Sequence, residues 1–286
     1  MAREEIRKTY KLFIGGKFPR SESGRSYLVS DAKGRFAANA AQASRKDARD
    51  AVQAARKAFA GWSAATAYNR GQVLYRVAEV MEGRRAQFVE EVGAAEGLSS
   101  RKAAAAVDAA IDRWVWYAGW TDKLAQIDGS ANPVAGPFFN FSIPEPTGVV
   151  AVIAPQSSSL LGLTSVLAPA LVPGNTAVVL ASEGRPLPAI TLAEVMATAD
   201  VPGGVVNVLT GTTAEVGPWL ASHLDVNAID LAGAGESAAD WEAAAADNVK
   251  RVLRPAATEP DWNGVPTTSR MRAFLETKTV WHPAGV

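Results

Sequence analysis

The chain of 286 residues contains no cysteine and only two histidines. Without cysteine it can form no disulfide and offers no thiolate as a nucleophile or metal ligand. The histidines, His223 and His282, lie far apart in the sequence, so a metal cluster or a Ser–His pair has little to build on. We therefore predict no metal site. We expect His223, which follows a predicted helix, to have a helix-terminal or surface role rather than a catalytic one.

Net charge and targeting signals are absent as well. Lys plus Arg and Asp plus Glu both total 29, so the formal net charge is zero. This balance argues against nucleic acid or an anionic membrane surface as a partner. The first residues, MAREEIRKTYK, have mixed charge and no apolar segment of the secretory type. We therefore expect a cytoplasmic protein.

An uncharged stretch from Pro146 to Ser182 is long enough to suggest a membrane span, but internal prolines interrupt it. Within it, residues 148–153 and 177–180 have the pattern of short buried strands. Leucines recur at helical spacing between them, at Leu160, Leu163, Leu167 and Leu171. A strand, a helix and a strand, all apolar, predict a parallel sheet covered on both faces, and we expect no membrane insertion.

The same alternation continues as far as residue 253. Further strands are predicted at residues 205–209, 228–231 and 249–253, with helices between them. Five such strands form a doubly wound, Rossmann-type parallel sheet of the α/β class. Helices also precede the sheet, and the first begins at Ser44, where Asp47 completes a capping box. We assign residues 1–126 and 147–254 to one cofactor-binding-type domain.

Two segments do not follow this alternation. Phe139, Phe141 and Ile143 alternate with polar residues, which predicts a half-buried strand, either packed on the core or exposed as an interface strand. After a linker at residues 255–269, Met271–Trp281 has the pattern of a last strand that needs an edge to pair with. Both segments therefore stand apart from the predicted main sheet.

Several segments carry the motifs of one known family. In chain order they are LFIGGKF, WVWYAGW, GPFFNFSIPEPTGVVAVIAP, LAPALVPGNTAVV, VPGGVVNVLTG, SHLDV and FLETKTVW. On these motifs the chain resembles the aldehyde dehydrogenase superfamily along nearly its whole length. The resemblance implies an NAD(P)-binding domain, a catalytic domain and a small oligomerisation arm made of a hairpin and the C-terminal strand, which we assign to residues 127–146 and 270–286. It also implies that the terminal strand extends a sheet in the neighbouring subunit's catalytic domain.

The departures from the family pattern concern catalysis. Only Arg254–Arg270 occupy the place that the resemblance gives to a catalytic domain with its nucleophilic cysteine, and this is too short for a domain. The position of the general base falls on Pro255, and that of the oxyanion-binding asparagine falls on Ser157. Aldehyde oxidation through a thiohemiacetal needs all three groups, so we predict a pseudoenzyme. We expect the serines at 157–159 to cap a helix rather than to act as nucleophiles.

The cofactor site is altered as well. The resemblance assigns cofactor contacts to Pro155, Glu183, Gly211 and Gly233. It also places Leu180 where the family has a ribose-binding lysine, Ala234 where it has a serine, and Gln156 where it has a tryptophan. We therefore expect no firmly bound cofactor, and at most weak NAD(P) binding. A tight turn is predicted at residues 233–235, with anion binding at a helix N-terminus as the alternative.

The arm strands are present although the catalytic domain is not. We therefore expect a non-catalytic subunit that assembles with a full-length aldehyde dehydrogenase, because a homodimer would not provide the sheet that the terminal strand needs. The alternatives are an NAD(P)-binding module and an accessory subunit of an active aldehyde oxidoreductase complex. The predicted interface residues are Phe139, Phe141, Ile143, Leu275, Thr277, Thr279 and Trp281.

Overall fold

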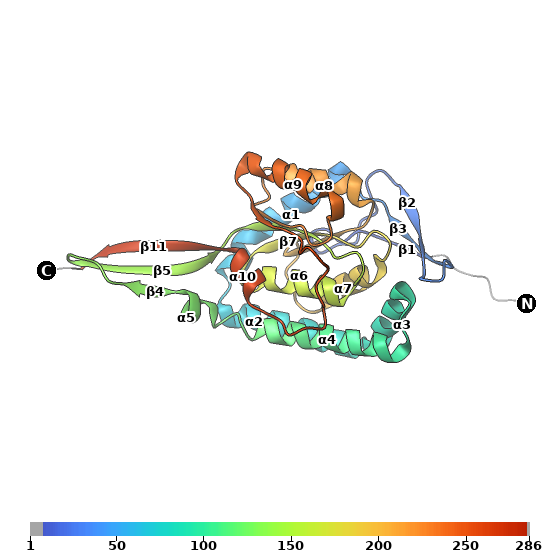
Figure 1. Ribbon diagram of the computed structural model, residues 1–286, viewed down its shortest axis with the longest axis horizontal. Coiled ribbons are helices and arrows are strands. Elements are labelled where there is room, and N and C mark those ends of the chain that lie inside the picture. Colours follow the sequence, from blue (N-terminus) through green and yellow to red (C-terminus); the bar gives the residue numbers. More distant parts are fainter. Residues whose placement is uncertain (1–7, 285–286) are drawn as a thin grey trace, which may run out of the picture.

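A parallel five-stranded sheet lies between two layers of helices (Figure 1). The computed structural model describes residues 8–284. The strands run in the order β10-β9-β6-β7-β8. They are β6 (Val149–Ile153), β7 (Thr176–Leu180), β8 (Val206–Leu209), β9 (Ala228–Asp230) and β10 (Arg251–Leu253). The predicted doubly wound α/β fold is confirmed.

Both faces of the sheet are covered because its central strands are apolar on both faces. All residues of β6 and β7 are buried. Val150 and Val152 face one helical layer, whereas Val149, Ala151 and Ile153 face the other. The first layer contains α2 (Ala67–Gly83), α3 (Arg85–Glu96), α4 (Ser100–Ala118), α6 (Leu161–Leu171) and α7 (Leu187–Thr198). The second contains α1 (Arg45–Ala64), α8 (Thr213–Ser222) and α9 (Ala238–Ala245).

The N-terminal part of the chain adds a small sheet beside these layers (Figure 1). Its order is β1-β3-β2, with β1 at Thr9–Tyr10, β2 at Ser26–Ser30 and β3 at Phe36–Ala41. The chain then enters α1 through the predicted capping box, in which Ser44 N donates to Asp47 Oδ2 at 2.8 Å. Among residues 8–284, no helix is both long enough and apolar enough to cross a bilayer.

An arm extends away from the body at the end opposite the small sheet (Figure 1). It is an antiparallel sheet in the order β11-β5-β4, made of β4 (Ser130–Asn132), β5 (Phe138–Pro146) and β11 (Leu275–Pro283), after the short helix α5 (Leu124–Asp128). β11 pairs with β5 from end to end, so the chain itself supplies an edge for its last strand. In the part of the chain that the structure describes, the outer edge of β11 is unpaired.

The two sides of the arm carry different predicted interface residues. Phe141 lies opposite Val280 and Ser142 lies opposite Thr279. Directly opposed residues of an antiparallel pair point to the same face. Phe139, Phe141 and Ile143 therefore occupy one face, while Leu275, Thr277, Thr279 and Trp281 occupy the other. The seven residues do not form one continuous surface.

The last strand begins later than predicted. Ser269–Ala273 form the helix α10, and β11 starts only at Leu275. Met271 and Phe274 are completely buried in the body. The Phe274 carbonyl accepts hydrogen bonds from Asn175 Nδ2 at 3.0 Å and from Thr147 N at 3.2 Å. The apolar residues at 271–274 therefore anchor the base of the arm in the core instead of extending the strand.

Candidate functional site

The parallel strands all end at one edge of the sheet, where doubly wound folds bind their ligands. The chain passes from β6 to β7 on one side, whereas β9 lies on the other side of β6. The topological switch point is therefore between β6 and β9. Gly233 N donates to Ile153 O at 2.9 Å across this point. Most of the predicted site residues lie in the loops that follow these strands.

Gln156 links the ends of β6 and β7. Its Oε1 accepts from Glu183 N at 3.0 Å, and its Nε2 donates to Ala154 O at 2.8 Å. Its carbonyl oxygen accepts from Ser182 Oγ at 3.1 Å and from Arg185 Nη1 at 3.4 Å. Gln156 therefore acts as a structural link at the position that the resemblance gives to a tryptophan.

The three serines after β6 have three different roles. Ser158 Oγ accepts from Gly162 N at 2.9 Å in the first turn of α6, but the N-cap residue of this helix is Leu160 and not one of the serines. Ser159 instead donates to Glu96 Oε1 at 2.7 Å, and Ser157 donates to the carboxylate of Glu259. Since the hydrogen-bond partner of Ser157 is an exposed carboxylate and not a histidine or lysine, the site does not assemble an activated serine.

Glu183 follows β7 and reaches the N-terminus of α8. Its Oε2 accepts from Thr213 N at 2.8 Å, so the carboxylate satisfies a free amide at the positive end of that helix. The Tyr27 hydroxyl donates to Glu183 O at 3.2 Å. Burial raises the pKa of Tyr27, which keeps this hydroxyl protonated as a donor. The predicted ribose-binding residue is thus held within its own chain.

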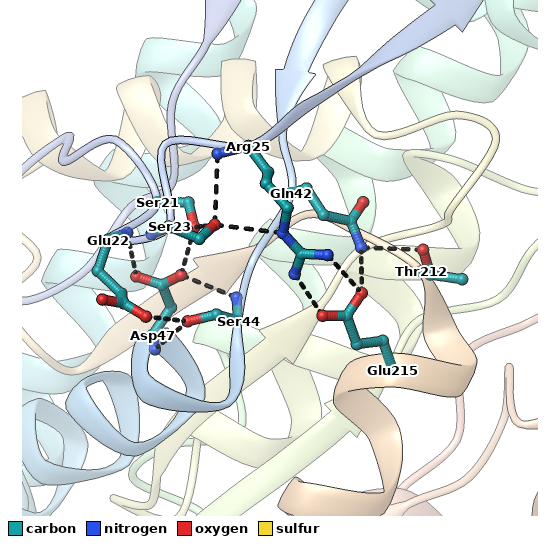
Figure 2. Close-up of polar contacts among 9 residues, drawn as sticks. All are labelled: Ser21, Glu22, Ser23, Arg25, Gln42, Ser44, Asp47, Thr212 and Glu215. Carbon is teal, nitrogen blue, oxygen red and sulfur yellow. Dashed lines mark hydrogen bonds and ion pairs between the residues drawn. The ribbon is translucent and has the colours of Figure 1, made fainter.

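A polar network fixes α8 to the N-terminal part of the chain (Figure 2). Arg25 forms an ion pair with Glu215 in the first turn of α8. Gln42 Nε2 donates to Glu215 Oε2 at 3.0 Å and to Thr212 Oγ1 at 2.9 Å. The hydrogen bond from Arg25 lowers the pKa of Glu215, so this carboxylate stays charged. With two carboxylates already beside it, the N-terminus of α8 is poorly suited to bind an anion.

Packing alone accounts for two glycines that the resemblance assigns to the cofactor. A Cβ on Gly233 would lie 1.8 Å from the carbonyl oxygen of Ala154. Gly211 has a φ of +145°, and a Cβ there would lie 3.1 Å from Ala43 N. The tight turn lies two residues earlier than predicted, over residues 231–234, where Ala234 N donates to Leu231 O at 3.0 Å, and a 3-10 helix follows at Gly235–Ser237. Neither glycine needs a nucleotide to explain its presence.

The other predicted positions are distributed between core and surface. Leu180 is completely buried in the apolar cluster between the sheet and α1. Ala234 is 6% exposed, and Pro155 packs against Gly162. Pro255, at the position of the general base, lines a surface hollow. These residues do not converge on a single reactive point.

The most deeply buried ion pair at this edge was not predicted. Asp230 ends β9, its carboxylate is fully buried, and it pairs with Arg270 of α10. Ala232 N donates to Asp230 Oδ1 at 3.0 Å. Burial raises the pKa of Asp230, and Arg270 opposes that shift by favouring the charged form. One signal was available in the sequence, because an aspartate inside an apolar strand requires a partner.

Residues 255–269 run across this edge and separate two hollows. One, of about 350 Å³, lies beside Gln156, Gly233 and Arg270. The other, of about 560 Å³, lies between α4 and the Ser157 loop. Neither has a histidine among its described lining residues, and residues 8–284 contain no group of three or more metal-ligating side chains placed to hold an ion.

Comparison with known proteins identifies the family. The aldehyde dehydrogenase family model matches residues 18–256. Retinal dehydrogenase 2 of Gallus gallus is 38% identical over 258 residues, covering 87% of this chain and 48% of that protein. The putative aldehyde dehydrogenase DhaS of Bacillus subtilis is 33% identical, covering 86% of this chain and 50% of that protein.

Solved structures give the same result. A putative aldehyde dehydrogenase from Burkholderia cenocepacia superposes with a TM-score of 0.82 at 32% identity, covering 85% of this chain and 50% of that chain. The NAD+ complex of an aldehyde dehydrogenase from Bacillus cereus gives 0.81 at 27% identity, covering 86% and 50%. The chain thus spans about half the length of the relatives that it matches, and it has their NAD-binding type of fold. It belongs to the aldehyde dehydrogenase family.

Proposed function

We propose that this chain is a non-catalytic subunit that assembles with a full-length NAD(P)-dependent aldehyde dehydrogenase and supports or regulates it. The observation that carries this proposal is the outer edge of β11. The strand has nine residues, most of them exposed, and it is the last strand in the order β11-β5-β4. An exposed strand edge offers a row of backbone groups to which another chain can add a strand.

Exposed aromatic side chains on the arm support the same proposal. Phe139 is 55% exposed and Trp281 is 58% exposed. The Phe139 and Phe141 rings lie 5.3 Å apart on one face, and the Phe138 and Trp281 rings lie 5.7 Å apart on the other. Aromatic residues are enriched in protein interfaces. A partner strand beside β11 would have rings near it on both faces of the arm.

The absence of activity follows from the chemistry that the chain can supply. With no cysteine among the 286 residues, no thiohemiacetal can form on this chain. At the switch point, Gln156 and Glu183 are bonded to the chain itself, and Leu180 has no donor for a ribose hydroxyl. The residues present therefore fit NAD(P) poorly.

An NAD(P)-binding module is the second candidate, and the position of Glu183 favours it. In dinucleotide-binding folds an acidic residue near a strand end binds the ribose hydroxyls. Here that carboxylate would first have to give up its 2.8 Å bond to Thr213 N. An accessory role in an active complex is compatible with the same arm. A cytoplasmic location is part of the proposal, supported by relatives named as cytosolic enzymes.

Co-purification of the tagged chain from its source cells, with the partner identified by mass, tests the proposal. We expect a full-length aldehyde dehydrogenase in fixed stoichiometry and no aldehyde oxidation by the chain alone. Calorimetric titration with NAD+ separates the two candidates. A low-micromolar dissociation constant, without a copurifying enzyme, would favour the nucleotide-binding module instead.

A further inference from the structure

We infer that residues 255–269, here called the strap, seal the strand-end edge of this chain from within. The sealed edge would be closed to a partner subunit, which would engage the arm instead. The second part of this inference rests on the proposed function, whereas the first part does not. The strap follows β10 and passes beside α4 before it enters α10 (Figure 1).

The strap satisfies buried polar groups of α4. Arg113 is only 7% exposed, and its Nη2 donates to the strap carbonyl of Gly264 at 2.7 Å. Burial lowers the pKa of Arg113. One turn further along α4, the Tyr117 hydroxyl donates to Thr267 O at 3.1 Å. A partner that displaced the strap and covered the same surface would take these two acceptors away, although Arg113 would keep its bond to Ser165 Oγ.

The C-terminal end of the strap is held by the buried ion pair. Arg270, the residue after the strap, pairs with the fully buried Asp230. Its guanidinium also lies 5.8 Å from the ring centre of Trp262, which packs against the core. A buried carboxylate that loses its partner is strongly destabilising. A partner domain that displaced the strap would have to replace this cation as well as the two carbonyl acceptors.

The N-terminal half of the strap makes weaker contacts. Residues 256–261 are exposed, and Glu259 there accepts hydrogen bonds from Ser157 Oγ and Trp262 Nε1. Exposed polar contacts of this kind contribute little to stability. The seal therefore depends on residues 262–270 and not on the exposed residues 256–261. This differs from the arm, whose outer strand edge is still open to a partner.

Hydrogen exchange on the isolated chain tests the seal. Arg270→Gln should raise the exchange rates of the hydrogen-bonded strap amides, those of Asn263 and Gly264, by about 100-fold or more, because it leaves Asp230 buried and unpaired. Arg272→Gln is the matched control on the same helix, since Arg272 pairs with Asp128 at the surface. It should leave these rates unchanged. Equal effects of the two variants would overturn the inference.

A milder variant covers the case in which Arg270→Gln does not fold. Tyr117→Phe keeps the ring and removes only the hydrogen bond to Thr267 O. It should raise exchange at the amides of Asn263 and Gly264 by up to about tenfold, as expected for one hydrogen bond. No change at these residues would contradict the seal, because it would mean that the strap is held independently of α4.

Two single-cysteine variants test where the partner binds, since the chain has no cysteine of its own. Ala257→Cys places a thiol on the exposed strap, and Thr277→Cys places one on β11. After reaction with a polyethylene glycol maleimide, assembly with the copurified enzyme should survive the label at 257 and fail with the label at 277. The reverse result would overturn the inference. If even the unlabelled chain fails to assemble, the proposed function falls with the second part, and hydrogen exchange still decides the seal.

Discussion

The central strand β6 and the arm strand β11 follow different rules within one chain. Every residue of β6 is buried, and neighbouring strands pair with it on both sides. β11 is largely exposed, and among the described residues it pairs only with β5. Burial on both faces specifies the body, whereas the arm depends mainly on backbone pairing. The body buries its central strands completely, whereas the arm leaves one strand edge and most of β11 exposed.

The largest expected effect compares two phenylalanines that differ in burial. Phe274→Ala removes a completely buried ring at the base of the arm and should lower the free energy of unfolding by about 3–5 kcal/mol. Phe139→Ala removes a ring that is 55% exposed and should cost less than about 1 kcal/mol. Urea denaturation measures both. Similar losses would mean that the arm belongs to the same cooperative core as the body.

A second comparison tests whether packing explains the retained glycine at the switch point. Gly233→Ala would place a methyl group against the Ala154 carbonyl and should cost about 1–3 kcal/mol or more in the nucleotide-free chain. Gly184→Ala is the control, because nothing lies within 4 Å of a Cβ there. A stable Gly233→Ala chain with weakened NAD+ binding would restore the cofactor interpretation of this residue.

A third comparison concerns two valines at the surface. Val249 has a left-handed φ of 57° and is 88% exposed, so its β-branched side chain adds strain without packing. Val249→Gly should therefore stabilise the chain by about 1 kcal/mol. Val265 is 87% exposed without this backbone conformation, and Val265→Gly should bring no gain. Thermal unfolding of the two variants distinguishes relief of strain from loss of an exposed apolar group.

The last expected effect is a pH dependence that arises from a buried lysine of the body. Burial lowers the pKa of Lys250 to about 8 from 10.5. Between these values the unfolded chain binds more protons than the folded chain, so the contribution of Lys250 makes stability rise with pH. Lys250→Met should flatten this rise between about pH 8 and pH 10. Parallel curves for Lys250→Met and the unaltered chain would contradict the assignment.

Local patterns were sufficient to predict the body of the molecule. The uncharged strand–helix–strand segment predicted β6, α6 and β7 because apolar residues there fill both faces of a sheet. Ser44 and Asp47 predicted the start of α1 because a capping box requires only a spacing of three residues. Information of this kind is contained within a few neighbouring residues.

The site and the arm depend on contacts that such patterns do not contain. Asp230 and Arg270 are 40 residues apart, and only the tertiary structure shows that they pair. The division of the arm residues between two faces follows from the pairing of β11 with β5. Met271 and Phe274 are spaced as on a helix, a signal that was overlooked in favour of the strand pattern that follows.

Native mass spectrometry tests the central claim most directly, namely that the arm joins this chain to a full-length aldehyde dehydrogenase. The chain is mixed with the copurified enzyme, either intact or lacking residues 276–286. This cut spares Phe274, whose side chain is buried in the body. For the intact chain we predict a discrete hetero-oligomer. For the shortened chain we predict no complex, and a circular dichroism spectrum that still shows a folded body. A shortened chain that still forms the complex, or an intact chain that stays monomeric beside the enzyme, would contradict the account.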